Sequence, residues 1–144
     1  MPPPRSPCTD AELLAEARSA ADHAYSPYSG WRVGAAVAFA DGGVFRGANV
    51  ENGSYGLTIC AERVAVCCGV VAGAGGPIAR VALTCRDRAG DLVAGIVPCG
   101  ACLQVLHEFG APDTAIVIDG GGVFRLADFL PRPFGAGVEV PRQA

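Results

Sequence analysis

Strand-like and helix-like segments alternate through the middle of this chain, and their order restricts the folds that it can adopt. Apolar runs over residues 44–50, 79–84 and 114–118 have the length and composition of strands. Between them, residues 60–72 and 99–109 are rich in Ala, Val and Leu and are long enough to be helices. Because a helix that joins two strands of one sheet makes a crossover connection, part of the sheet should be parallel.

The flanking segments complete the predicted architecture. They are a helix over residues 10–24 with Thr9 or Asp10 as its N-cap, a strand over 33–40 in a hairpin with 44–50, and a last strand over 123–126 after a glycine-rich turn. The resulting order, α-β-β-α-β-α-β-β, predicts an α/β fold. We expect a three-layer sandwich in which helices flank a mixed five-stranded sheet.

The length and composition are those of one globular domain. The chain has 144 residues, of which 51% are hydrophobic and 17% charged, so it can bury a core and is not a disordered chain. We expect a single domain over residues 9–135, between a disordered tail over 1–8 and a C-terminal tail over 136–144. No apolar stretch reaches the ~18 residues of a membrane helix, and residues 1–7 lack the apolar run of a signal peptide. We therefore expect a cytoplasmic protein.

The charge distribution argues against a nucleic-acid or membrane partner. The formal net charge is -3, lysine is absent from the sequence, and the 11 arginines are scattered. Affinity for nucleic acids depends mainly on phosphate contacts from a gathered basic patch, and binding at an anionic membrane surface needs a similar patch. Strong, salt-sensitive binding to single-stranded DNA or RNA would overturn this prediction.

The seven cysteines fall into two groups. An odd number of cysteines without a secretion signal makes a disulfide framework a poor explanation, and favours metal ligands or buried thiols. Cys60, Cys99 and Cys102 lie at the starts of two expected helices and are the candidate ligands. The other four are predicted to be buried thiols at Cys67, Cys68 and Cys85 and an exposed tail thiol at Cys8.

The three candidate ligands can converge on one zinc ion. Cys99 and Cys102 are three residues apart and so share a helix face, while Cys60 opens the other helix. Free N–H groups and the positive end of the helix dipole favour thiolate over thiol at both places. Three protein ligands leave the fourth tetrahedral position open, which is typical of a catalytic zinc. His107 lies about 140° round the helix from Cys102, so we expect it on the surface or in packing.

Glu62 is the candidate proton carrier beside this site. Zinc lowers the pKa of a bound water to about 7, although three anionic thiolates weaken that effect. Glu62 would take a proton from this water and pass it to the substrate, and Arg63 would donate hydrogen bonds to the ligand sulfurs. A Cys-x-Glu motif followed by Pro-Cys-x-x-Cys is the signature of zinc deaminases, in which activated water displaces the amino group of a base.

Several runs of residues together resemble the cytidine deaminase family, specifically its small homotetrameric members. The resemblance extends from Tyr25 to about Phe134. The matching runs are Tyr25-Ser26-Pro27-Tyr28-Ser29, Arg32-Val33-Gly34-Ala35-Ala36, Gly47-Ala48-Asn49-Val50-Glu51-Asn52, Cys60-Ala61-Glu62-Arg63, Pro98-Cys99-Gly100-Ala101-Cys102 and Leu130-Pro131. The resemblance implies that family's fold, one Zn²⁺ per chain, and hydrolytic deamination of cytidine and deoxycytidine to uridine and deoxyuridine with release of ammonia.

The resemblance also implies how the nucleoside would be held. Asn49 and Glu51 correspond to the pair that hydrogen-bonds the ribose hydroxyls. The Ala61 backbone N–H would contact the base carbonyl, and Glu62 would also contact the ring nitrogen. Trp31 would form the aromatic wall of the base pocket. A carboxylate at Glu51 accepts hydrogen bonds from free hydroxyls and disfavours a nearby phosphate, so a nucleoside is favoured over a nucleotide.

Other parts of the resemblance concern neighbouring subunits and departures from the family. Gly53, Tyr55 and Phe134 correspond to elements that reach into a neighbouring subunit's site, so a homotetramer would complete each pocket. The sequence departs from the family at Trp31, Val97 and Leu103, where relatives often have Phe, Ser and Arg. These departures leave the exact nucleoside preference open.

Two other functions are compatible with the same motifs. A related deaminase would act on a modified cytidine or a nucleoside antibiotic, and a panel of nucleosides separates it from a cytidine deaminase. A non-catalytic zinc-binding interaction module, by contrast, would hold zinc in a closed four-ligand site and turn over nothing.

Overall fold

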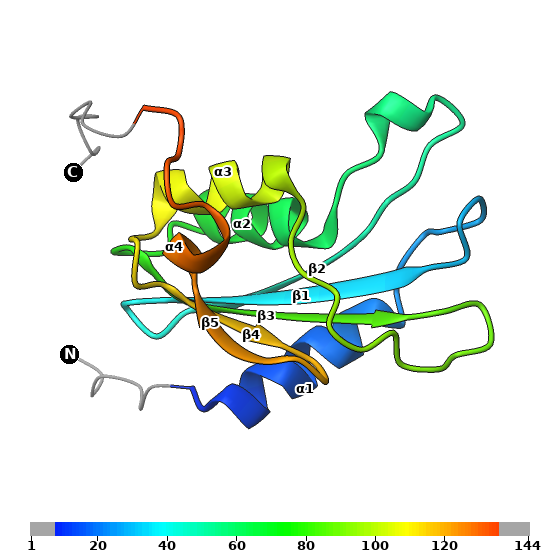
Figure 1. The fold of residues 1–144 in the computed structure, drawn as a ribbon, viewed down its shortest axis with the longest axis horizontal. Coiled ribbons are helices and arrows are strands. Elements are labelled where there is room, and N and C mark those ends of the chain that lie inside the picture. Colours follow the sequence, from blue (N-terminus) through cyan, green and yellow to red (C-terminus); the bar gives the residue numbers. More distant parts are fainter. Residues whose placement is uncertain (1–7, 136–144) are drawn as a thin grey trace.

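A mixed five-stranded sheet in the order β2-β1-β3-β4-β5 forms the middle layer of the fold (Figure 1). The computed structural model describes residues 8–135, so the expected tails lie outside it, except for Cys8. The elements are α1 (Asp10–Ala21), β1 (Arg32–Phe39), β2 (Val44–Ala48), the 3₁₀ turn η1 (Tyr55–Leu57), α2 (Ala61–Val71), β3 (Ile78–Arg86), α3 (Gly100–Phe109), β4 (Ala115–Ile118), β5 (Gly122–Arg125) and α4 (Leu126–Phe129).

The strand pairing confirms the predicted combination of hairpin and crossover. β1 pairs antiparallel with both β2 and β3, and β4 pairs antiparallel with β5. β3 and β4 are parallel, and the segment between them contains α3. A parallel pair requires such a long crossover connection, so the sequence order of elements is sufficient to explain this part of the sheet.

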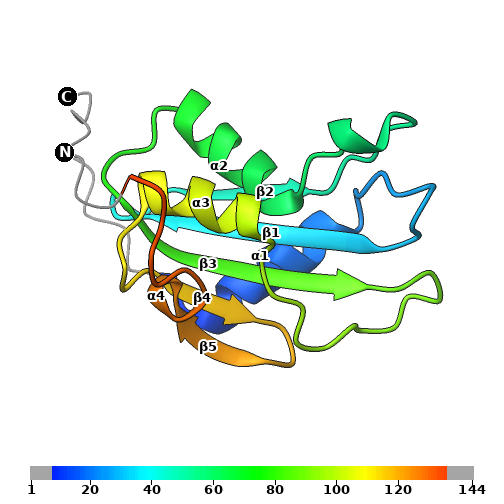
Figure 2. The same ribbon diagram turned by 45° about the horizontal axis from the view of Figure 1, so that its top comes forward.

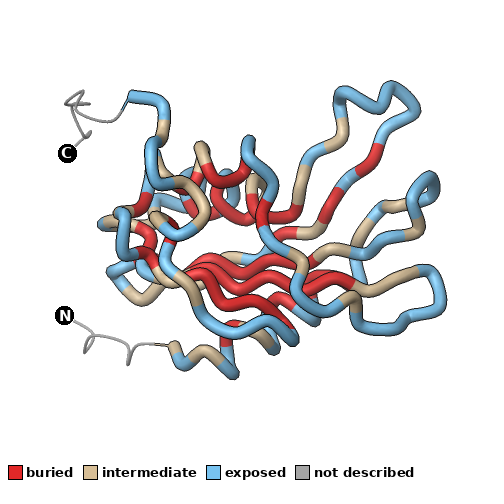
Figure 3. Tube along the Cα trace, viewed as in Figure 1, coloured by how far each residue is buried: buried red, intermediate tan, exposed pale blue. Residues whose placement is uncertain are grey.

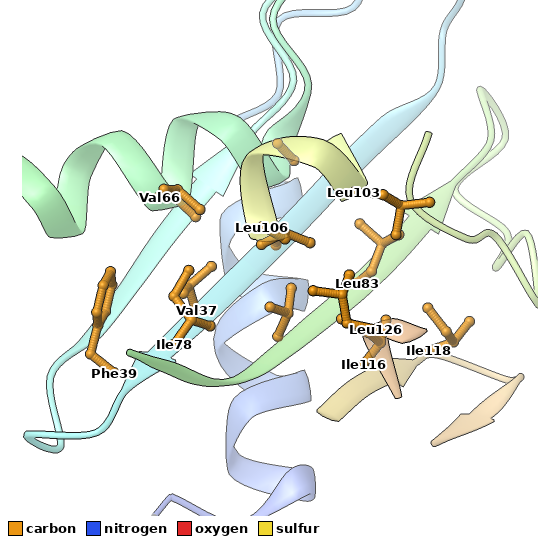
Figure 4. Packing of buried hydrophobic residues seen from close by; sticks show 14 residues of the cluster. Val37, Phe39, Val66, Ile78, Leu83, Leu103, Leu106, Ile116, Ile118 and Leu126 are labelled. Atoms are coloured by element: carbon orange, nitrogen blue, oxygen red, sulfur yellow. The ribbon is translucent and has the colours of Figure 1, made fainter. Parts of the chain in front are cut away.

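Helices cover both faces of the sheet. α1 lies on one face, and α2, α3 and α4 lie on the other (Figures 1 and 2). Every residue of β1 from Gly34 to Phe39 is buried, because a central strand covered on both faces has no solvent side. Figure 4 shows the larger core, in which Val66 of α2 and Leu106 of α3 pack over Val37 and Leu83 of the sheet. No helix over residues 8–135 has both the length and the hydropathy to cross a membrane.

α1 begins at a capping box and ends earlier than the sequence suggests. The Thr9 hydroxyl accepts a hydrogen bond from the Glu12 amide over 3.2 Å, and the Glu12 carboxylate accepts one from the Thr9 amide over 2.8 Å. This reciprocal pair satisfies two free amides of the first turn. The helix ends at Ala21 instead of residue 24, because the chain turns there toward Tyr25, whose amide donates to the Asn49 carbonyl over 3.0 Å.

Two glycines allow helices to lie unusually close to the sheet. A Cβ atom at Gly34 of β1 would lie 2.0 Å from the Ala17 carbonyl oxygen of α1. On the other face, a Cβ at Gly47 of β2 would lie 2.2 Å from the Ala61 carbonyl oxygen of α2. Real Cβ atoms do not approach backbone this closely, so glycine at these positions fixes how near α1 and α2 lie to the sheet.

Candidate metal centre

The three candidate cysteines converge from two helix N-termini. Cys60 is the N-cap of α2 and Cys99 is the N-cap of α3. Each therefore lies one residue before its helix, whereas the sequence predicted it as the first helical residue. Cys102 lies in the first turn of α3 and is buried. The Sγ–Sγ distances are 3.9 Å from Cys60 to Cys99 and 3.4 Å from Cys99 to Cys102, and all three sulfurs lie within 4.8 Å of one another.

The electrostatics of the cluster call for a cation. Hydrogen bonds from Cys102, and next from Arg63, lower the pKa of the Cys60 thiol to about 5. The pKa of Cys102 is raised, because its thiol donates to the Cys60 sulfur and because it is buried. One thiolate therefore forms readily, but a second thiolate beside it would be repelled by the negative charge of the first. A dication removes this repulsion, and zinc binds cysteine as thiolate.

The donor set fits a zinc ion with an open position. Among the described residues the metal-ligand cluster consists of Cys60, Cys99 and Cys102 and contains no fourth side-chain ligand. Sulfur is a preferred ligand of Zn²⁺, and a site with three protein ligands keeps its fourth tetrahedral position for water or substrate. The geometry thus agrees with the cofactor expected from the sequence.

Glu62 and Arg63 lie directly beside the cluster. The side chain of Glu62 is 4% exposed, and burial raises the pKa of its carboxyl group to about 7. A carboxyl group that titrates near neutral pH can both accept and donate a proton under working conditions. Arg63 Nη2 donates to Cys60 Sγ over 3.6 Å and to the Thr58 carbonyl over 3.3 Å. Its buried Nε has no hydrogen-bond partner among the described residues.

Backbone pairing joins the segment after β2 to the start of α2. The amide of Val50 donates to the Ile59 carbonyl over 2.9 Å, and the Ile59 amide returns a bond to the Val50 carbonyl over 3.0 Å. Ile59 directly precedes Cys60, so this bridge brings residues 49–51 next to the cluster. Alternation along an extended chain then places the side chains of Asn49 and Glu51 on one side and Val50 on the other. Accordingly, Asn49 and Glu51 are buried while Val50 is exposed.

Asn49 holds the backbone on either side of Arg32. Its Oδ1 accepts from the Val33 amide and its Nδ2 donates to the Trp31 carbonyl, both over 2.9 Å. The amide therefore fixes the start of β1 next to Trp31. Glu51 accepts hydrogen bonds from the Tyr28 and Ser29 amides and from the Ser29 hydroxyl. These loop partners of Glu51 could not be expected from the sequence, because hydrogen bonds over more than 20 residues leave no local pattern.

The three expected aromatic contacts are exposed in the single chain. Trp31 is 45% exposed, Tyr55 75% and Phe134 88%. The segment from 52 to 58, which includes Gly53 and Tyr55, projects from the body of the fold, and most of it is exposed (Figures 1 and 3). Phe134 is nevertheless fixed in place. Its amide donates to Gln104 Oε1 over 3.0 Å and its carbonyl accepts from Gln104 Nε2 over 3.1 Å.

The cysteines outside the cluster only partly follow the prediction. Cys85 is buried as expected, but Cys67 and Cys68 are exposed, and Cys8 is half-buried, not fully exposed. The prediction for Cys67 and Cys68 was wrong because α2 contacts the sheet through its other side, which includes Ala65 and Gly69. The apolar composition of α2 all round conceals this difference between its faces.

The two remaining departures from the family lie in different surroundings. Leu103 is 6% exposed and belongs to the core between α3 and the sheet. Val97 is 48% exposed in the loop that leads to Cys99. Neither side chain brings a charge to the metal centre, so Arg63 is the described cation in contact with the ligand sulfurs.

Comparison with known proteins places this site in a family. A sequence profile described as the "Cytidine and deoxycytidylate deaminase zinc-binding region" matches residues 7–118. The chain belongs to the cytidine deaminase family. It is 45% identical over 132 residues to a cytidine deaminase of Mycobacterium tuberculosis, which covers 91% of this chain and 92% of that protein. A cytidine deaminase of Halalkalibacterium halodurans is 42% identical over 106 residues, or 74% and 76% of the two chains.

Solved structures of the family share the fold. The crystal structure of cytidine deaminase from Burkholderia pseudomallei aligns with a TM-score of 0.78 at 41% identity, over 88% of this chain and 99% of that one. The cytidine deaminase from Mycobacterium tuberculosis aligns with a TM-score of 0.69 at 44% identity, over 85% and 94% of the two chains. The α/β sandwich expected from the sequence is thus the family fold.

Proposed function

We propose that this chain catalyses the hydrolytic deamination of cytidine and deoxycytidine to uridine and deoxyuridine, with release of ammonia. One observation carries the proposal. Three cysteine sulfurs lie within 4.8 Å of one another at two helix N-termini, without a fourth side-chain ligand among residues 8–135. The buried Glu62 follows Cys60 by two residues. The relatives that are named cytidine deaminases support the same reaction.

In this proposal Cys60, Cys99 and Cys102 hold one zinc ion, and Glu62 moves the protons. Zinc would supply Lewis-acid chemistry, by lowering the pKa of a bound water toward neutrality. The Glu62 carboxylate accepts the water proton, holds it in a site from which burial excludes bulk water, and donates it toward the substrate base. Arg63 offsets part of the thiolate charge through its hydrogen bond to Cys60.

The substrate contacts in this proposal lie on the segments around the cluster. Asn49 and Glu51 bind the ribose hydroxyls, the Ala61 amide binds the base carbonyl, and Trp31 lies against the base. The ionised state of Glu51 supports a nucleoside over a nucleotide, since a phosphate close to this carboxylate would be repelled. Hydrogen bonds, led by that of the Ser29 hydroxyl, lower the pKa of Glu51, which keeps it ionised.

We further propose a homotetramer in which Gly53, Tyr55 and Phe134 complete a neighbouring subunit's site. The exposure of Tyr55 and Phe134 supports this, because large exposed aromatic side chains are enriched where partners dock. Phe134→Ala should leave the melting temperature of a single subunit nearly unchanged but raise KM for cytidine.

The domain limits 9–135 and the cytoplasmic location stay predictions, which limited proteolysis and cell fractionation can check.

The direct test combines turnover with metal content. Purified wild-type chain should contain about one zinc ion and should lower the cytidine absorbance as uridine forms. Glu62→Gln should keep the zinc and lose roughly 10²- to 10⁴-fold in kcat. A Glu62→Gln variant that contains zinc and has the wild-type rate would refute the proton-carrier role.

The same assay decides between the other functions. If the chain is a specialised deaminase, a modified cytidine or nucleoside antibiotic in a substrate panel should have a higher kcat/KM than cytidine. Zinc without turnover of any nucleoside in the panel would instead support a non-catalytic zinc-binding module.

A further inference from the structure

One hydroxyl group links two of the residues assigned above to substrate binding. Ser29 Oγ donates its proton to Glu51 Oε1 and accepts a hydrogen bond from the Trp31 amide over 3.0 Å. Ser29 lies in the loop between α1 and β1, 22 residues before Glu51. Both contacts come from the same atom, so the hydroxyl fixes the distance between the carboxylate and the backbone of the aromatic residue.

The hydrogen bonds of Glu51 leave one acceptor position free, and Ser29 determines which. An ionised carboxylate offers about four lone-pair positions, two on each oxygen. The amides of Tyr28 and Ser29 donate to Oε2 over 2.9 and 3.2 Å, which fills that oxygen. Oε1 receives one bond from the Ser29 hydroxyl among the described residues. The position that remains for a ligand hydroxyl is therefore on the oxygen that Ser29 orients.

The hydrogen bonds around Glu51 and Trp31 restrain this orientation, although Ser29 itself is exposed. Glu51 is 9% exposed, and its own amide donates to the Tyr25 carbonyl over 2.8 Å, so its backbone is fixed as well. Trp31 is held from both sides, because its amide donates to Ser29 and its carbonyl accepts from Asn49. A change at Ser29 therefore affects the free acceptor of Glu51 and the anchoring of Trp31 together.

We propose that Ser29 is a positioning residue for sugar recognition, which aims the free lone pair of Glu51 Oε1 at a ribose hydroxyl. This inference rests on the proposed function, in which Glu51 binds the sugar and Trp31 lies against the base. The backbone amides fix one carboxylate oxygen, and the Ser29 hydroxyl fixes the other. Without that hydroxyl, Oε1 loses its own hydrogen bond, and only the two amide bonds to Oε2 still orient the carboxylate. The lone pair of Oε1 that Ser29 occupied then also becomes available to water.

The test compares cytidine with 2′,3′-dideoxycytidine, which lacks the hydroxyls that Glu51 would bind. Ser29→Ala should lower kcat/KM for cytidine roughly 10- to 100-fold, the loss expected when the misaligned Glu51 carboxylate no longer accepts its hydrogen bond from the sugar hydroxyl. The change should appear mainly in KM, because the sugar contact is made in the ground state and in the transition state alike. For the dideoxy substrate the same variant should lose less than about threefold.

Ser26 provides the matched control. It lies in the same loop, and among residues 8–135 its hydroxyl has no hydrogen-bond partner. Ser26→Ala should therefore keep the wild-type ratio of kcat/KM for the two substrates. Ser29→Thr keeps the hydroxyl and should restore most of the preference for cytidine. If Ser29→Ala does not fold, Ser29→Cys has nearly the same size with a weaker donor, and should show the same selective loss.

The outcomes separate this inference from the proposed function. A selective loss on cytidine supports the positioning role, whereas an equal loss on both substrates, with a lowered melting temperature, shows a merely structural role and overturns it. Wild-type kinetics in Ser29→Ala overturns it too, and leaves the proposed function intact. A wild-type chain that contains zinc but does not deaminate cytidine overturns the proposed function and this inference with it.

Discussion

The close approach of α2 to β2 gives a way to move the metal centre without touching any ligand. A Cβ atom at Gly47 would lie 2.2 Å from the Ala61 carbonyl oxygen and 2.4 Å from the Ala65 amide nitrogen. Both are backbone atoms, so no side chain can rotate away. Gly47→Ala should force the N-terminal turn of α2 to retreat by about 1 Å to reach an ordinary contact distance. Cys60 and Glu62, on either side of Ala61, would move with it.

The size of this shift sets the expected effects. Overpacking of this kind costs about 3 kcal/mol of the free energy of unfolding, or a fall in melting temperature on the order of 10 °C for a chain of this length. Zinc ligand distances tolerate only about 0.2 Å, and a misplacement of about 1 Å costs roughly 10²-fold in rate. In the fraction of Gly47→Ala that stays folded, both the zinc content per chain and kcat for cytidine should therefore be lower than in the wild type.

Two glycines serve as controls for the Gly47 variant. Gly34→Ala creates an equally close contact, 2.0 Å from the Ala17 carbonyl oxygen, but against α1 on the opposite face of the sheet. It should destabilise the fold to a similar extent and keep zinc in the folded fraction. Gly56→Ala meets no atom within 4 Å in the chain and should leave the zinc content and the melting temperature nearly unchanged.

The assays are circular dichroism for melting, mass spectrometry for zinc per chain, and cytidine absorbance for rate. If Gly47→Ala kept the zinc content and rate of the wild type, the reasoning that Gly47 positions the ligands would be refuted.

Further variants test the ligand set and an ion pair between α1 and the end of β4. Cys102→Ser should abolish zinc binding and deamination, whereas Cys67→Ser, which changes an exposed thiol on α2, should preserve both. Incubation with a strong chelator should remove activity, and added Zn²⁺ should restore it; activity that survives complete metal removal would contradict the zinc assignment. The Arg18 guanidinium donates to both carboxylate oxygens of the buried Asp119, which lowers the pKa of that carboxyl. Because the ionised form is favoured in the folded state, this contribution is present above the unfolded pKa of about 4 and is lost as the pH falls through the lower folded value. Arg18→Met should cost about 1–2 kcal/mol at pH 7, as Arg18 is half exposed, and urea unfolding should show that difference shrinking in acid; a difference constant down to pH 2 would argue against the pairing.

The features that are local in sequence were the ones that the sequence could predict. Cys99 and Cys102 are three residues apart, a spacing that any α-helix turns into proximity. Glu62 follows Cys60 closely enough that the start of one helix carries both. The order of strands and helices required a crossover, and therefore the parallel pairing of β3 with β4. These conclusions depend only on helix geometry and chain connectivity.

Features that depend on which surfaces meet were not available from the sequence. α2 is apolar on nearly all sides, so its composition did not show that Cys67 and Cys68 face outward. That was decided by the contact of α2 with the sheet, which Gly47 permits. The partners of Glu51 are likewise a tertiary result, because Ser29 is 22 residues away and reaches it only when a loop folds over the end of the sheet.

The sequence by itself thus determined the chemistry of the site, namely three thiolates and a carboxylate at two helix starts. The tertiary structure decided how the two helix starts meet and how Glu51 and Trp31 are oriented. The physical reason is the range of the interactions. Helix spacing and the pKa effects of a helix N-terminus act within a turn of the chain. Packing against a sheet and hydrogen bonds between distant loops exist only after the whole domain has folded.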